Sequence, residues 1–361
     1  MSNLFEPVQL GSLTLSNRLV MAPMTRNRAN QQGLVSSLMI EHYRQRATAG
    51  LIIAESSPVS AQAVGYPNTP GMFNEEQARS WAPLVEAVHQ KGGHIFAQLQ
   101  HCGRISHSSM QLDNAQPVAP SAIKAEGQAV TYTGMLDYQT PRPLETAEIP
   151  ELVEQFKQAA KLAKLAGFDG IEIHGANGYI IDQFLRDGSN QRTDQYGGSA
   201  QNRMRLLNEI LDAVISVWPS ERVGVRLTPE NSFNSMSDSQ PQQHFGYFIE
   251  QLNTRQLAYV HLLEGDMMTK LSLLNYLELR NKFSGTYIAN NGYNAEKAQQ
   301  ALDNGNASLV AFGLPFLANP DLVRRYKEQL PLNAVDFDTF YGGNALGYTD
   351  YKYYHSDQAL A

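Results

Sequence analysis

Short runs of apolar residues recur along the chain, and longer stretches with apolar residues at helical spacing separate them. Most of the runs are hydrophobic almost throughout, which is typical of parallel strands that are covered on both faces. The runs that we predict as strands are Arg18–Met24, Leu51–Ser57, His94–His101, Gly170–Ala176, Val223–Pro229, Leu257–Gly265, Thr286–Gly292 and Leu309–Phe316.

The stretches between these runs predict helices. Asn74–Lys91 starts with a possible asparagine cap and carries Trp81, Leu84 and Val88 on one face. Ile149–Ala166 shows the same spacing and ends before a glycine, which is a helix stop signal. The other predicted helices are Ser199–Trp218, Gln240–Thr254, Lys270–Lys282, Asn294–Asn304 and Asn319–Leu330.

Eight strands that alternate with helices predict one (β/α)8 barrel, the TIM-barrel fold, rather than two domains. We therefore expect residues 1–361 to form a single domain. Only Cys102–Ala147, after the third strand, breaks the alternation, because it is too rich in turn residues for a simple barrel loop. We interpret it as an insertion (about 102–147) that forms small strands and caps the barrel. Long loops of this kind are usually functional.

The composition, with 42% hydrophobic and 17% charged residues, is that of a globular protein. The net charge of -7 argues against nucleic acid as the main partner. No run reaches the roughly 18 apolar residues of a membrane span, and Met1–Glu6 lacks the features of a signal peptide. The single cysteine, Cys102, excludes an internal disulfide and fits a reducing compartment. We expect a cytoplasmic protein that binds small molecules, as a monomer or weak homodimer.

The fourth predicted strand leads into the most informative group of polar residues. His174, Asn177 and Tyr179 follow one another within six residues, at the carboxyl end of a strand, where such barrels carry their active sites. An imidazole and a carboxamide are neutral donors for an oxygen that gains negative charge, and a phenol can deliver a proton nearby. This group predicts an enzyme.

Further polar or turn residues end the other predicted strands. The loops after strands seven and eight of such barrels often hold a phosphate on backbone N–H groups. The sequence contains no metal-ligand spacing, nucleophile elbow or Rossmann glycine loop. A reaction that side chains alone cannot carry out would therefore need an organic cofactor. Amides, one arginine and a phosphate site suit FMN. The candidates are Thr25, Ser56, Gln98, Gln100, Arg226, Asn291, Gly292 and Gly313.

Longer stretches of sequence carry a family resemblance that covers almost the whole chain. In them the chain resembles the Old Yellow Enzyme family of FMN-dependent ene-reductases, particularly its bacterial N-ethylmaleimide and nitroester reductases. The stretches are Asn17–Arg26, Glu41–Ala47, Gln98–Arg104, His174–Tyr179, Asp182–Leu185, Ser189–Ser199, Asn319–Leu322 and Phe340–Gly343.

The resemblance implies a reaction in two halves. NADPH gives a hydride to FMN and leaves. The hydride then passes from FMN N5 to the β-carbon of an α,β-unsaturated carbonyl or nitro compound, and quinones are further candidate substrates. Tyr179 would protonate the α-carbon, while His174 and Asn177 would hold the carbonyl or nitro oxygen. The preference for NADPH over NADH rests on the family alone.

The resemblance also implies binding roles. Thr25 would bond the flavin C4 oxygen, Gln98 would bind the pyrimidine edge, and Arg226 would stabilise negative charge near N1. Pro23 and Ser56 would contact the flavin ring. Backbone N–H groups near Asn291, Gly292 and Gly313 would bind the phosphate. Tyr351 would close the substrate pocket.

Two positions depart from the family pattern. Many relatives carry tryptophan where this chain has Gln100, so we expect a wider, wetter substrate pocket and an altered substrate preference. Relatives also follow the glycine at Gly313 with an arginine that clasps the phosphate, whereas this chain has Leu314. A charge-assisted hydrogen bond contributes about 1.5–3 kcal/mol, so we expect FMN to be held less tightly than is usual in the family.

Other interpretations remain open from the sequence. His174 could be a core histidine, Tyr179 a packing aromatic, and Arg226 the partner of a carboxylate at the barrel base. Gln98 and Thr25 could merely form hydrogen bonds with backbone groups at the ends of strands. The same scaffold also serves dienoyl-CoA and nitroester reductases. Outside enzymes, the alternative is a non-catalytic flavin-binding barrel that acts as a redox sensor or store.

Overall fold

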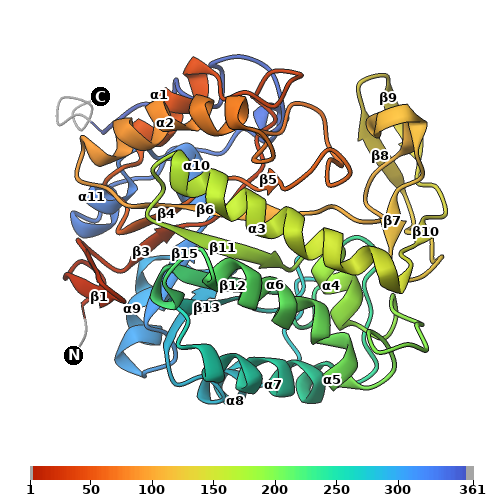
Figure 1. The fold of residues 1–361 in the computed structure, drawn as a ribbon. Coiled ribbons are helices and arrows are strands. Elements are labelled where there is room, and N and C mark those ends of the chain that lie inside the picture. The colour runs from red at the N-terminus through yellow and green to blue at the C-terminus, as the bar shows by residue number, and fades with distance from the viewer. Residues whose placement is uncertain (1–2, 355–361) are drawn as a thin grey trace.

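A closed barrel of parallel strands forms the centre of the molecule (Figure 1). The computed structural model describes residues 3–354. Every neighbouring pair of barrel strands is parallel, and pairings of β15 with β3 and of β6 with β11 close the circle. The predicted (β/α)8 barrel is therefore confirmed. Its strands are β3 (Leu19–Met21), β4 (Leu51–Ile53), β6 (Ile95–Gln100), β11 (Gly170–Gly175), β12 (Val223–Leu227), β13 (Tyr259–Leu263), β14 (Thr286–Asn290) and β15 (Leu309–Phe312).

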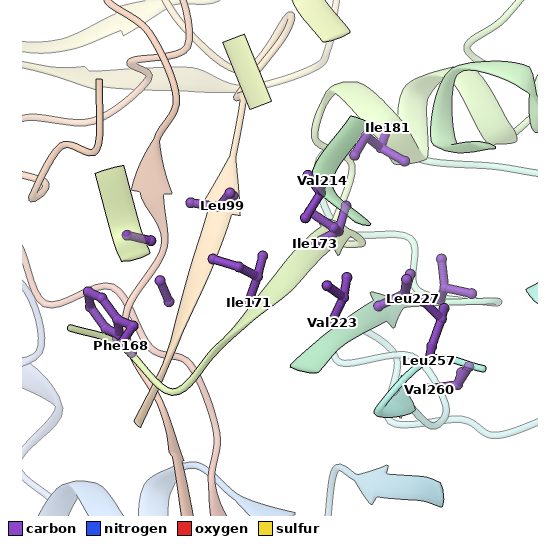
Figure 2. Packing of buried hydrophobic residues seen from close by; sticks show 14 of the residues in the cluster. Leu99, Phe168, Ile171, Ile173, Ile181, Val214, Val223, Leu227, Leu257 and Val260 are labelled. Carbon is purple, nitrogen blue, oxygen red and sulfur yellow. The ribbon is translucent and has the colours of Figure 1, made fainter. Parts of the chain in front are cut away.

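Alternate residues of each strand face the helices or the barrel interior. Outward side chains such as Ile171, Ile173 and Val223 belong to the large core under the helices (Figure 2). A separate cluster contains the alternate residues Val20 and Phe96 together with leucines of the β1 (Val8–Leu10) and β2 (Leu13–Leu15) hairpin. The interior is thus apolar at the amino ends of the strands, and its polar side chains lie toward the carboxyl ends.

Helices cover the outside of the barrel as the sequence pattern predicts. Asn74 caps the helix after β4, since its side chain accepts a hydrogen bond from the Gln77 amide. The helix after the insertion starts at Ile149 and packs beside β11. Helices of the ring include α2 (Glu75–His89), α3 (Ile149–Leu165), α6 (Arg205–Ile215), α7 (Pro241–Leu252), α9 (Ala295–Asp303) and the short α11 (Leu322–Lys327).

Several predicted boundaries are wrong. The predicted strand Leu309–Phe316 ends at Phe312, because α10 (Leu314–Ala318) begins there with Pro315 in its first turn, where proline suits a helix. The helix predicted from Lys270 begins only with α8 (Tyr276–Asn281), and Lys270 has a left-handed φ of 64°. The predicted helix Ser199–Trp218 is divided into α5 (Ala200–Arg203) and α6. The helices α1 (Ser37–Gln45), α4 (Ile180–Leu185) and α10 were not predicted.

The segment after β6 forms the small strands that its composition suggests. β8 (Gln128–Thr131) and β9 (Gly134–Asp137) make an antiparallel hairpin, while β7 (Val118–Ala119) pairs with β10 (Arg142–Pro143). Apolar residues of this insertion, among them Tyr138, form one cluster with Tyr179 at the carboxyl end of the barrel. The insertion therefore caps the end that carries the candidate site. Within residues 3–354, no helix has the length and apolar character to cross a membrane.

Candidate active site

Polar side chains from neighbouring strands converge in the carboxyl half of the barrel. His174 of β11 lies beside Arg226 of β12 in the strand register, and Arg226 lies beside His261 of β13. Glu172 is paired in the same way with Gln98 of β6. All five are buried. Because alternate residues of a strand share a face, Glu172 and His174 point to the same interior.

His174 and Tyr179 lie close together in neutral form. Their ring centroids are 5.1 Å apart, and the Tyr179 hydroxyl lies 3.1 Å from that of Tyr66. Burial lowers the pKa of His174 well below its ordinary value, and the nearby Arg226 cation lowers it further. Burial raises the pKa of the Tyr179 phenol. At neutral pH the site therefore offers a neutral imidazole and a protonated phenol.

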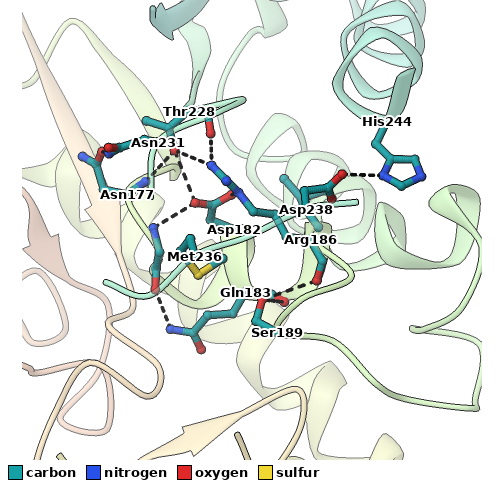
Figure 3. A network of polar contacts seen from close by, with 12 residues as sticks. Asn177, Asp182, Gln183, Arg186, Ser189, Thr228, Asn231, Met236, Asp238 and His244 are labelled. Atoms are coloured by element: carbon teal, nitrogen blue, oxygen red, sulfur yellow. Dashed lines mark hydrogen bonds and ion pairs between the residues drawn. The ribbon is translucent and has the colours of Figure 1, made fainter. Parts of the chain in front are cut away.

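A buried polar network holds the loop between these two residues (Figure 3). The Asn177 amide donates to Thr228 Oγ1 at 2.9 Å, and Asn177 has a left-handed φ of 57°. The Gly178 amide donates to Asp182 at 2.8 Å, and Asp182 forms a buried ion pair with Arg186 at 2.9 Å. Asn177, predicted from the sequence as an oxygen-binding group, thus sits on backbone that is anchored from both sides.

Arg226 has hydrogen-bonding capacity that the protein does not fill. Its Nη2 donates to Asn290 Oδ1 at 2.9 Å, whereas Nε and Nη1 have no acceptor among residues 3–354. No ion pair joins it to a carboxylate in the described part of the chain, contrary to the alternative that it pairs at the barrel base. A buried cation with unfilled N–H groups fits a ligand edge rich in acceptors, such as the pyrimidine edge of FMN.

Gln98 and Ser56 are brought together, as expected of residues that contact one ligand. The Ser56 hydroxyl donates to Gln98 Oε1, and Gln98 Nε2 donates to Glu172 Oε1 at 2.6 Å. Glu172 also bonds His261 Nδ1 at 2.8 Å. Burial lowers the pKa of His261, so its neutral ring donates to the carboxylate. Gln98 is therefore held in place by protein groups at both ends of its amide.

The turns after β14 and β15 expose backbone. Asn291 and Gly292 have left-handed φ values of 94° and 72°, and the space where a side chain of Gly292 would stand is open. Asn291 uses its own side chain to bond the Glu264 carbonyl at 2.7 Å. Gly313 precedes α10, whose first residue is Leu314. Leu314 is 43% exposed. These turns fit a phosphate held on backbone amides, without a cation from position 314.

The remaining predicted residues lie around this group. Pro23 and Thr25 follow β3 and are half-buried. Gln100 is buried, with Nε2 donating to Cys102 Sγ at 2.9 Å and Oε1 without a donor in the described structure. Tyr351 is half-buried, and its hydroxyl accepts from the Asp336 amide at 3.1 Å.

Several residues at this site were not among the predicted site residues. They include His261, and Asn231, whose Nδ2 donates to Asn177 Oδ1. Glu172 had a usable signal, because a carboxylate two residues before His174 in a buried strand must face the same interior. Asn290 precedes Asn291 in the predicted turn after strand seven, but only Asn291 was predicted to contact the cofactor. Tyr66 and Asn231 lie in loops, and their partners are remote in sequence, so the pattern carried no signal for either.

Comparisons with known proteins agree with this geometry. The model of the NADH:flavin oxidoreductase / NADH oxidase family matches residues 3–333. The 12-oxophytodienoate reductase 1 of Oryza sativa subsp. japonica is 41% identical over 357 residues, which cover 97% of this chain and 93% of that protein. The chain belongs to the Old Yellow Enzyme family. Like its relatives in this family, it is a flavin oxidoreductase that uses FMN and a nicotinamide reductant.

Solved structures of the Old Yellow Enzyme family share the whole fold. Morphinone reductase is 45% identical with a TM-score of 0.95, and the match covers 99% of this chain and 97% of that one. The Old Yellow Enzyme homologue from Zymomonas mobilis is 42% identical with a TM-score of 0.94, over 97% of this chain and 99% of that one.

Proposed function

We propose that this protein reduces the C=C bond of α,β-unsaturated carbonyl or nitro compounds. The observation that carries the proposal is the grouping of His174, Asn177 and Tyr179 at the capped end of the barrel, with His174 beside the buried Arg226 in the strand register. Bound FMN supplies the hydride, which is chemistry that the side chains themselves cannot perform.

In this proposal the chain holds the substrate oxygen and delivers the proton. His174 and Asn177 donate hydrogen bonds to the carbonyl or nitro oxygen as negative charge develops on it, and one such donor contributes roughly 2.7–4 kcal/mol in enzymes. Tyr179 gives its proton to the α-carbon. The hydroxyl of Tyr66, 3.1 Å from that of Tyr179, orients the phenol.

The remaining residues bind the two ligands. On the FMN side we assign Thr25 to the C4 oxygen, Gln98 to the pyrimidine edge and Arg226 to N1, with Pro23 and Ser56 against the ring. The phosphate is assigned to backbone donors at Asn291, Gly292 and Gly313, next to Leu314. Gln100 and Tyr351 are assigned to the walls of the substrate pocket. NADPH is the proposed reductant.

An anaerobic experiment on the holoenzyme tests this function. NADPH and NADH are added in turn, and the loss of oxidised flavin absorbance is followed. Then 2-cyclohexen-1-one, a nitroalkene or a quinone is mixed with the reduced enzyme. We expect faster bleaching with NADPH, and rapid return of the yellow colour with the enone or the nitroalkene. The proposal fails if these electrophiles reoxidise the flavin no faster than buffer.

The same experiment separates the second candidate, a flavin-binding redox sensor or store. A sensor would be bleached by a nicotinamide but would not be recoloured by alkenes. The buried, protonated Tyr179 beside neutral His174 favours the enzyme, because a sensor needs no proton donor above a substrate pocket.

A further inference from the structure

The side chains of Asn231 and Asn177 lie next to each other (Figure 3), and Asn231 Nδ2 donates a hydrogen bond to Asn177 Oδ1. We propose that Asn231 is a positioning residue for the reduction described above: it holds the Asn177 carbonyl oxygen and so leaves Asn177 Nδ2 to face the substrate oxygen. This inference rests on the proposed function.

The orientation of Asn231 follows from its backbone partners. Asn231 is 1% exposed, and its Oδ1 accepts from the amides of Met267 at 3.3 Å and Phe233 at 3.5 Å. A backbone N–H can only donate, so this end of the Asn231 carboxamide must be its oxygen. The other end is therefore Nδ2, a donor, and it lies 3.1 Å from Asn177 Oδ1.

The orientation of Asn177 follows in turn. Because Oδ1 of Asn177 accepts from Asn231, the end that remains for a substrate is the donor Nδ2, for which residues 3–354 provide no acceptor. A reversed carboxamide would set a carbonyl oxygen against the carbonyl or nitro oxygen of the substrate. Both atoms would then be acceptors, and the stabilisation expected from this donor would become repulsion.

Asn231 acts on the side chain alone, because other residues fix the backbone of Asn177. Thr228 Oγ1 accepts from the Asn177 amide at 2.9 Å, and Asn234 Nδ2 donates to its carbonyl at 2.8 Å. His174 has no comparable support, since its Nδ1 has no partner in the described structure. Asn177 is thus the donor whose direction the protein determines.

Two substitutions separate an orienting role from a packing role. In Asn231→Asp, one carboxylate oxygen keeps the two backbone bonds, and the other repels Asn177 Oδ1 and reverses the carboxamide. Asn231→Ala removes the hold but does not impose the reversed orientation. We therefore expect the activity at alkaline pH to decrease in the order wild type, Asn231→Ala, Asn231→Asp. A packing role gives the opposite order for the variants, because aspartate keeps the volume and alanine leaves a cavity.

The measurement is the rate at which 2-cyclohexen-1-one reoxidises dithionite-reduced holoenzyme, without oxygen, from pH 5 to 9. At the alkaline end we expect Asn231→Asp to be about 100-fold slower than wild type, the loss typical of one oxyanion donor. The rate of this variant relative to wild type should recover as pH falls. The introduced carboxyl group is then protonated, and its O–H donates to Asn177 Oδ1 in place of the amide N–H.

Asn234→Asp is the matched control, since it adds the same charge beside the backbone of Asn177 and not beside its carboxamide. It should lose less activity than Asn231→Asp at the alkaline end, because the Asn177 carboxamide keeps its orientation. The inference is overturned if Asn231→Ala is slower than Asn231→Asp, or if Asn231→Asp matches wild type over the whole pH range. If wild-type enzyme is not reoxidised by the enone, the proposed function fails instead.

Discussion

At the scale of single residues, burial shifts the pKa values of His174 and Tyr179 in opposite directions and leaves both side chains neutral. Burial disfavours the charged form of each group, which is the cation for imidazole and the anion for phenol. The sequence predicted that these residues act together. It also predicted them as neutral donors, but it could not predict what shifts their pKa values, which is burial in both cases, with Arg226 beside His174 and the insertion packed against Tyr179.

Glu55, two residues after β4, gives a prediction about stability. Burial raises its pKa from 4.5 to about 7, although the Arg26 amide and the Tyr43 hydroxyl donate to it. The folded protein therefore keeps a proton that the unfolded chain loses, and the free energy of unfolding falls as pH rises from 4.5 to about 7. Glu55→Gln should remove this loss.

Urea unfolding of wild-type and Glu55→Gln holoenzyme at pH 5 and pH 8 measures the effect. The stability of the variant relative to wild type should be greater at pH 8 than at pH 5, while pH effects shared by both proteins cancel. An equal difference at the two pH values would show that Glu55 does not keep its proton in the folded state.

At the scale of elements, apolar runs predicted the barrel strands well, because strands covered on both faces are hydrophobic throughout. Short helices were harder to predict. α4 and α10 have too few residues for a helical period to emerge, and α10 directly follows an apolar strand. Its first residue is Leu314, where the family resemblance leads us to expect an arginine, so the misplaced boundary falls at the proposed phosphate site.

Leu314→Arg should tighten FMN binding. Leu314 is 43% exposed, so an arginine fits without disturbing the core and can reach a phosphate held at Gly313. A new charge-assisted hydrogen bond of about 1.5–3 kcal/mol corresponds to a roughly 10- to 150-fold lower Kd. Flavin fluorescence after dilution of the holoenzyme reports FMN release, with Leu314→Met as the neutral control. Equal release from both variants would show that no cation is missing.

At the scale of the whole molecule, the barrel gathers residues that are remote in sequence. The sequence predicted the fold, the capping insertion and the segments that carry the polar residues. It could not predict contacts such as Tyr66 with Tyr179, 113 residues apart, or Asn231 with Asn177, 54 residues apart. These pairs form only when the strands close, because loops that follow different strands then meet at one end of the barrel.

In the proposed mechanism nicotinamide and alkene bind in turn at that end of the barrel, so the two halves of the reaction can be measured separately. The central claim is that Tyr179 supplies the proton in the second half only. The most direct test is anaerobic stopped-flow spectroscopy of Tyr179→Phe holoenzyme. Reduction by NADPH should keep the wild-type rate. Reoxidation by 2-cyclohexen-1-one should slow by roughly 100-fold or more, as expected for loss of a general acid. Unchanged reoxidation, or an equal loss in both halves, would contradict the account.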